Sequence, residues 1–289
     1  MALEPLDPRL IERVVRAALE EDRASEDATT LATVDAGLLG RGVFLAKEDG
    51  VLAGIAVARA TFEAINSAVQ FEELVGDGSA FAKGDILAEV RGPVQALLQA
   101  ERVALNFLQR MSGTATMAAL FVGEVEGSKA VILDTRKTTP GLRDFEKYAV
   151  RCGGATNHRR DLAVMAMIKD NHREALALAG RSLADGVAAI RARTPGIAVE
   201  VEVDSLDDLD AALAAKPEWI LLDNMDVATM AEAVRRVAGR AKLEASGGVK
   251  LDTVRAIAKT GVDAISAGAL THSARALDIS LDLAIGRKP

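Results

Sequence analysis

The sequence predicts an α/β protein: an open or incomplete α/β barrel of about six parallel strands, joined to a smaller N-terminal α+β domain. Two observations support this prediction. Six short apolar runs alternate with helix-like segments in the second part of the chain, which indicates parallel strands joined by right-handed crossovers. Nearly every run also becomes polar or glycine-rich at its C-terminal end, where α/β barrels carry their reactive groups.

The smaller domain is expected over residues 1–112 and opens with helical spacing of apolar residues over 8–22. A polar, turn-rich stretch follows at 25–30. Pro93 then suits the first position of a long helix, which Ser112 and Gly113 are expected to end. Between these segments we expect short strands and one helix (55–66), the strands lying within 41–54, 69–81 and 83–92.

The barrel is expected over residues 113–289, with C-terminal helices packing back on the first domain. The predicted strands are the runs at 130–135, 163–170, 198–205, 219–224, 242–248 and 263–269. The predicted helices between the later strands cover 174–193, 207–215, 227–238 and 250–259.

The overall charge excludes some partners. The chain has 289 residues, 35 basic against 42 acidic, and a net charge of −7, which does not attract nucleic acid or an anionic membrane. Cys152 is the one cysteine, so no internal disulfide is possible. The N-terminus has no signal-peptide pattern, and no apolar run approaches the roughly 20 residues needed to span a bilayer. We therefore expect a cytoplasmic protein whose anion sites are local clusters of cations.

Two such clusters follow predicted strands. Arg136 and Lys137 come directly after the run at 130–135, with Arg143 close behind. The segment 151–172 concentrates further basic side chains around a glycine pair: Arg151, His158, Arg159, Arg160, Lys169 and His172. At about 6 Å and an effective dielectric of about 20, each pair of cations repels by roughly 3 kcal/mol. The pattern therefore predicts a bound polyanion, either a multiply charged acid or a phosphate ester.

Two carboxylates, Glu202 and Asp223, lie on strands expected to face these cations. Such a pair can hold sugar hydroxyls, coordinate Mg²⁺ or stabilise developing positive charge. The alternative is that they are salt-bridge partners of Lys169 and Arg159.

Small residues end the last two predicted strands. The segments are Ser246-Gly247-Gly248 and Ser266-Ala267-Gly268, with His272 just beyond. Small residues let backbone N–H groups approach a phosphate, and the last strands of a barrel are the frequent phosphate position.

Taken together, these residues resemble a known family, quinolinate phosphoribosyltransferase. The resemblance runs in order from about residue 20 to the C-terminus, through the motifs ERVALNFLQRMSGTAT, ILDTRKTTPGLR, KYAVRCGGATNHRRDLAVMAMIKDNH, VEVEVDSL, ILLDNM, EASGGV and ISAGALTHS. It implies transfer of a phosphoribosyl group from phosphoribosyl pyrophosphate to quinolinate, with release of pyrophosphate and CO₂. It also implies Mg²⁺ and a homodimer, or a higher oligomer, with shared active sites.

The resemblance assigns roles to residues. Those implied to bind quinolinate are Arg102, which reaches in from the other subunit, Arg136, His158, Arg159 and Lys169. Those implied to act in catalysis are Lys137, Lys169, Glu202 and Asp223. The phosphoribosyl and phosphate groups are assigned to Lys137, Glu202, Asp223, Ser246, Gly247, Gly248, Gly268 and His272. Mg²⁺ is expected mainly through the substrate, with Glu202 and Asp223 as further candidate ligands.

Other classes of function stay open at this point. A Schiff-base lyase on a barrel would use Lys169 or Lys137 as its nucleophile, although it would need one lysine and not a wall of cations. A non-catalytic module could bind a nucleotide or an oxyanion. A related phosphoribosyltransferase-like protein could act on a different acid.

Overall fold

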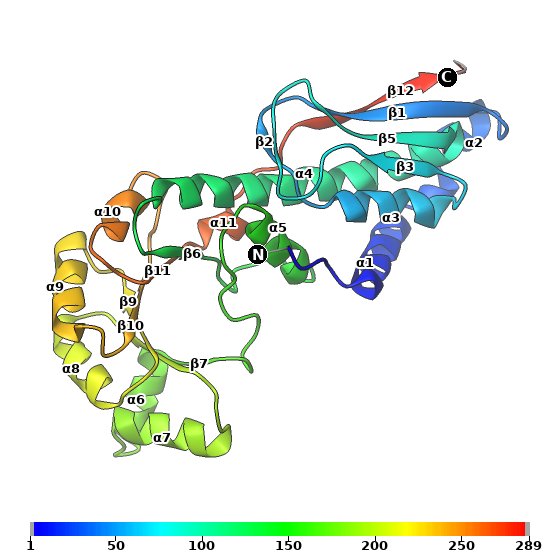
Figure 1. Cartoon of the computed structure of the whole chain (residues 1–289). Coiled ribbons are helices and arrows are strands. Elements are labelled where there is room, and N and C mark those ends of the chain that lie inside the picture. Colours follow the sequence, from blue (N-terminus) through cyan, green and yellow to red (C-terminus); the bar gives the residue numbers. More distant parts are fainter. Residues whose placement is uncertain (1–2, 287–289) are drawn as a thin grey trace. The chain divides into compact units, whose positions relative to one another are not determined.

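The structure is a computed structural model that describes residues 3–286. The described chain divides into two compact units (Figure 1). The first contains the residues up to Ala119, Thr139–Gly154 and the residues from Ala274 onward. The second contains Leu120–Thr138 and Ala155–Ser273. No helix in the described range is long and apolar enough to cross a bilayer.

The first unit contains a four-stranded antiparallel sheet with the strand order β12-β1-β5-β3. Its strands are β1 (Leu39–Ala46), β3 (Gln70–Glu73), β5 (Ile86–Pro93) and β12 (Ile279–Ile285), and a small second sheet pairs β2 (Gly50–Val51) with β4 (Ala80–Phe81). The helices are α1 (Pro8–Glu21), α2 (Ala28–Thr33), α3 (Ile55–Ile65), α5 (Arg143–Cys152) and the first part of α4 (Val94–Glu124). The polar stretch at 25–30 is only partly turn, because the Asp27 side chain accepts hydrogen bonds from the Thr29 and Thr30 amides and so starts α2.

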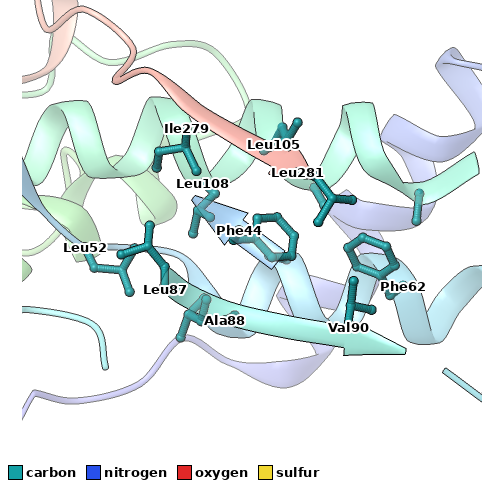
Figure 2. Close-up of a cluster of buried hydrophobic side chains, with 14 of the residues drawn as sticks. Phe44, Leu52, Phe62, Leu87, Ala88, Val90, Leu105, Leu108, Ile279 and Leu281 are labelled. Atoms are coloured by element: carbon teal, nitrogen blue, oxygen red, sulfur yellow. The ribbon is translucent and has the colours of Figure 1, made fainter. Parts of the chain in front are cut away.

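An aliphatic and aromatic core fills the first unit (Figure 2). Phe44 from β1 and Phe62 from α3 are fully buried and meet edge to face, with ring centroids 5.9 Å apart. Burying one such side chain contributes about 1.5–3 kcal/mol. Leu87, Leu108 and Leu281 surround them, so residues from three distant parts of the sequence share this core.

The C-terminal segment is a strand, and the prediction of C-terminal helices is wrong. β12 pairs antiparallel with β1 from Gly40 opposite Ile285 to Ala46 opposite Ile279. The reason is the period-two pattern of ISLDLAI, in which Ile279 and Leu281 are buried and the residues between them are more exposed.

α4 does not end at Ser112 and Gly113, which corrects a second prediction. The helix continues through both residues to Glu124. Both serve close packing within the first unit: the Ala53 amide donates to the Ser112 hydroxyl at 3.1 Å, and a Cβ at Gly113 would lie 1.9 Å from the Arg275 carbonyl oxygen. Small size, and not helix termination, explains this pair.

The second unit is built on a six-stranded parallel sheet with the order β6-β11-β10-β9-β8-β7. Its strands are β6 (Val131–Leu133), β7 (Ala166–Ile168), β8 (Val199–Val203), β9 (Trp219–Asp223), β10 (Lys242–Ser246) and β11 (Ala264–Ser266). Its helices are α6 (Asp170–Leu178), α7 (Leu183–Arg193), α8 (Leu206–Ala214), α9 (Val227–Val237), α10 (Val254–Ala258) and α11 (Ala269–His272). β6 and β7 are the edges, so the prediction of an open α/β barrel with six parallel strands is confirmed.

Each strand lies inside its predicted run, and a helix lies within each predicted helical segment, although α6 and α8 begin earlier, at Asp170 and Leu206, and α5 and α11 were not predicted. The single helix expected over 174–193 is two helices, α6 and α7. Gly180 lies between them with φ +67°, a conformation that glycine adopts without strain and that ends α6.

The packing at Gly113 generates a stability prediction. Gly113→Ala should lower the free energy of unfolding by about 1–3 kcal/mol, because the new methyl meets a backbone oxygen that cannot rotate away. Denaturant unfolding measures the change. Gly123→Ala in the same helix is the control: a Cβ there meets nothing within 4 Å, so this change should be neutral or stabilising by up to about 1 kcal/mol. Equal effects of the two substitutions would contradict the packing argument.

Candidate active site

A pocket of about 610 Å³ lies in the second unit, around the C-terminal ends of the parallel strands. The three kinds of residue expected at the site line this pocket: cations, carboxylates and small residues. The lining residues are Thr135, Arg136, Lys137, His158, Arg159, Met167, Lys169, Glu202, Leu221, Asp223, Asn224, Glu244, Ser246, Gly247, Gly248 and Ser266. The pocket therefore collects ten of the thirteen residues to which the sequence assigned a role.

Arg136 and Lys137 reach the pocket from the segment that follows β6. The Thr271 hydroxyl donates to the Lys137 carbonyl at 2.7 Å and fixes that backbone. The Nε atom of Arg136 is buried and has no hydrogen-bond partner in the described protein. A buried guanidinium donor without an acceptor is costly, so this atom favours an anionic guest.

Arg159 lies on the same wall. Its Nη1 donates to the Met165 carbonyl at 2.9 Å, which aims the guanidinium along β7. Burial, and then the like charge of Arg136, lower the pKa of Arg159 below its ordinary value. Two guanidinium groups that disfavour each other's charge are relieved when a carboxylate or phosphate lies between them.

Lys169 lies directly after β7 and forms an ion pair with Glu202 of β8. The alternative interpretation of Glu202, as a salt-bridge partner of Lys169, is thus confirmed. Asp223 accepts a hydrogen bond from the Asn224 side chain at 2.8 Å. Both carboxylates still line the pocket, on the strands β8 and β9.

The small residues after β10 shape one edge of the pocket. Ser246 and Ser266 are joined through their hydroxyl groups at 3.0 Å, across β10 and β11. Gly247 has φ +91°, and a Cβ there would lie 2.3 Å from the Asn224 side-chain oxygen. Gly248 also has a positive φ, +59°, with open space where a Cβ would be. The backbone at this edge is therefore open to a ligand.

Three assigned residues do not line this pocket. Gly268 and His272 lie beside it, because a Cβ at Gly268 would be 2.9 Å from the His272 ring and 3.2 Å from the Lys137 side chain. Arg102 is an exposed residue of α4 in the first unit. Of the other basic residues, His172 accepts from the Lys169 amide at 3.1 Å, and Arg151 bonds the Glu4 backbone in the first unit.

The sequence analysis missed two buried glutamates, Glu200 and Glu244. The exposed fractions of the two side chains are 0% and 2%, and both approach Nε2 of His158, at 3.4 Å and 3.1 Å. A charged residue inside an apolar strand, as in VEVEV and KLEAS, is the signal that could have found them.

These three groups alter one another's protonation. Burial opposes a charged imidazole, but Glu200 and Glu244 outweigh it and raise the pKa of His158 to about 9. Burial and the neighbouring Glu244 raise the pKa of Glu200 to about 7. The three side chains also have the spacing of a metal site, with ligand atoms within 4.8 Å of one another.

Fold and pocket together are typical of one class: enzymes on an open α/β barrel with their reactive groups at the carboxyl ends of the strands. Residues 27–112 match the family model of the quinolinate phosphoribosyl transferase N-terminal domain, and residues 114–282 match that of the C-terminal domain. The chain belongs to the quinolinate phosphoribosyl transferase family.

Individual relatives agree. The chain is 47% identical over 275 residues to nicotinate-nucleotide pyrophosphorylase [carboxylating] of Mycobacterium leprae, covering 93% of this chain and 95% of that one. It is 42% identical to a mitochondrial quinolinate phosphoribosyltransferase [decarboxylating] of Nicotiana tabacum, covering 94% of this chain and 82% of that one. Among solved structures, NadC from Streptococcus pyogenes has a TM-score of 0.92 at 41% identity, covering 98% and 99% of the two chains.

The edge after β10 generates a second prediction. Gly247→Ala should cost about 1–3 kcal/mol of stability and displace Asn224, because the left-handed backbone and the short contact both oppose a side chain. Denaturant unfolding and calorimetry with phosphoribosyl pyrophosphate measure the two effects. Gly248→Ala has the same chemistry without the contact and should cost less, about 1 kcal/mol. A Gly247→Ala protein with unchanged stability and binding would contradict this account of the edge.

Proposed function

We propose that this protein is a quinolinate phosphoribosyltransferase, which converts quinolinate and phosphoribosyl pyrophosphate to nicotinate mononucleotide, pyrophosphate and CO₂ in NAD biosynthesis. Membership of the family supports this reaction. The observation that carries it is the cationic wall of the pocket, where Arg136 has a buried donor without an acceptor and Arg159 opposes it with a like charge. Quinolinate supplies two adjacent carboxylates, the charge that this wall lacks.

The wall works by positioning. Arg136, Arg159 and Lys169 neutralise the two carboxylates, with His158 beside them in the pocket. The ring nitrogen is then held toward the anomeric carbon of the ribose, which converts a bimolecular reaction into one between neighbours. Lys137, Ser246 and the glycine edge Gly247-Gly248 provide the opposite side, where the phosphoribosyl group binds.

The carboxylates act on charge that develops during the reaction. The ribose passes through an oxocarbenium-like state as pyrophosphate departs, and the negative charges of Glu202 and Asp223 stabilise it. The pyridinium formed in this way withdraws electrons, so the carboxylate next to the ring nitrogen leaves as CO₂. The bonding electron pair stays on the ring carbon, which then takes a proton from solvent. No covalent bond to the protein is required.

Asp223 and Glu202 are the residues of this pocket that best fit Mg²⁺. The ion prefers oxygen ligands and is usually held by one or two carboxylates together with substrate phosphates. Asp223 and Glu202 both offer such oxygens at the pocket, and Glu202 shares its charge with Lys169. Bound Mg²⁺ would neutralise charge on the departing pyrophosphate.

The Schiff-base lyase is less well supported. Its nucleophile must be an amine free to attack a carbonyl group, whereas the Lys169 amine is held in an ion pair with Glu202. A lyase also leaves the two opposed guanidinium groups without a function.

The cationic wall generates a prediction for activity. Arg136→Ala and Lys169→Ala should each reduce turnover of quinolinate at least about 100-fold, because each removes a charge that positions the substrate. Release of CO₂ and formation of nicotinate mononucleotide measure turnover, and circular dichroism checks the fold. Arg181→Ala, a change of the same type on the surface of the same unit, is the control. A folded variant with full activity would remove that residue from the mechanism.

We also propose that the active enzyme is a homodimer, or a higher oligomer, whose sites are shared between subunits. Arg102 then completes the quinolinate site of the neighbouring copy. The exposure of Arg102 on α4 supports this proposal, since it leaves the side chain accessible to a second copy of the chain. We further propose that its partners are small-molecule substrates, with no nucleic acid and no membrane, in line with the net charge of −7. We also propose a cytoplasmic location.

Sharing of sites can be tested by complementation. Arg102→Ala and Lys169→Ala should each be inactive alone. A mixture refolded together should regain about a quarter of the parental activity, because half of the dimers are mixed and each mixed dimer has one intact site. The same assay on each variant refolded alone is the control. A mixture as inactive as its components would show that Arg102 acts within its own chain or not at all.

A further inference from the structure

His158 lies between two glutamates that come from different strands. Glu200 is on β8 and Glu244 is on β10, and β9 separates these strands in the sheet. Both carboxylates nevertheless approach the same ring nitrogen, Nε2 of His158. Both glutamates are buried. Glu244 and His158 also line the candidate active site. Glu200 is buried beside His158.

Hydrogen bonds hold the imidazole on every side. The Arg159 amide donates to Nδ1 at 2.6 Å, which fits the neutral ring with its hydrogen on Nε2, pointing toward Glu244 at 3.1 Å. Glu200 and Glu244 raise the pKa of His158, but a second proton, on Nδ1, would break the hydrogen bond from Arg159, so the two effects oppose each other. The His158 amide donates to the Asp134 carboxylate at 2.8 Å, and Asp134 also accepts from the Asn157 side chain. The ring, its own backbone and the backbone of the next residue are thereby fixed as one piece.

Two buried carboxylates at an anion pocket are unfavourable in two ways. They lose their hydration, and both oxygens of Glu200 lie buried without a hydrogen bond of normal length in the described protein. Their negative charge also opposes the charge of an acid substrate. The two charges favour the charged form of Arg159, and the closest contact of both carboxylates is with the imidazole.

We propose that Glu200 and Glu244 are positioning residues, which hold the His158 ring and, through the amide bonded to Nδ1, the Arg159 backbone in the orientation that binds the acid substrate. This inference rests on the proposed function. The two glutamates do not touch the reacting atoms; they act through His158. They support, from β8 and β10, the residues that contact the substrate.

A metal ion at these three side chains is the competing explanation of their spacing. Coordination by Nε2 would move the ring hydrogen to Nδ1, where the Arg159 amide would lose its acceptor. The observed hydrogen bond therefore favours a ring held by hydrogen bonds.

Steady-state kinetics with quinolinate and saturating phosphoribosyl pyrophosphate test the proposal. Glu244→Gln and, in case that variant fails to fold, Glu200→Gln should each raise KM for quinolinate at least about fivefold and change kcat by less than about threefold. Glu218→Gln makes the same chemical change outside the pocket and should leave both constants unaltered. A lower KM would show that the carboxylates act on the substrate through their charge, which overturns the proposal.

A double-mutant cycle separates action through His158 from direct action. The dissociation constant of quinolinate, measured by calorimetry, should change less than about twofold when Glu244→Gln is added to His158→Asn. If Glu244→Gln changes the dissociation constant by the same factor with and without His158→Asn, the proposal is overturned. The proposal is also overturned if the unmodified enzyme retains one equivalent of zinc that the Glu244→Gln variant loses. If the unmodified enzyme converts both substrates but the variants do not behave as expected, only the positioning role is ruled out. If the unmodified enzyme does not convert the substrates, the proposed function is ruled out.

Discussion

Repulsion among like charges is the constraint on which the site depends. Arg136, Lys137, Arg159 and Lys169 converge on one pocket of a protein whose net charge is negative. Only Lys169 among them has a carboxylate in an ion pair at this pocket. The surrounding chain fixes two of these cations: the Thr271 hydroxyl donates to the Lys137 carbonyl, and the Met165 carbonyl accepts from the Arg159 guanidinium. The molecule thus builds, before any ligand arrives, the charge pattern that a polyanion completes.

The parallel sheet makes this convergence inevitable. Every strand from β6 to β11 runs in the same direction, so all carboxyl ends meet at one edge. The chemistry of each segment after a strand therefore adds to a single pocket. The strands themselves contribute more than a scaffold, because Glu200 and Glu244 project from β8 and β10 to the ring of His158.

The pocket consequently presents charges of both signs. Cations line it together with the carboxylates of Glu202, Asp223 and Glu244, and the buried Glu200 lies beside His158. Fixed charges of both signs orient groups that simple attraction to an anion would leave mobile. The conformation of Gly247 serves the same end, since it leaves room for Asn224 beside Asp223.

The sequence by itself determined the six strands, their parallel direction and most of the pocket residues. Apolar runs that end in charged or glycine-rich segments identify both a buried strand and its functional end. Sequence motifs also identified the family. Only the tertiary structure decided which neighbour each charge acquired. Glu202 paired with Lys169, and two glutamates within apolar runs joined His158, since those contacts link residues more than 30 positions apart. Ser112, Gly113 and β12 show the same limit: local signals predicted a helix end and helices, and packing against distant residues produced a continuous helix and an added strand.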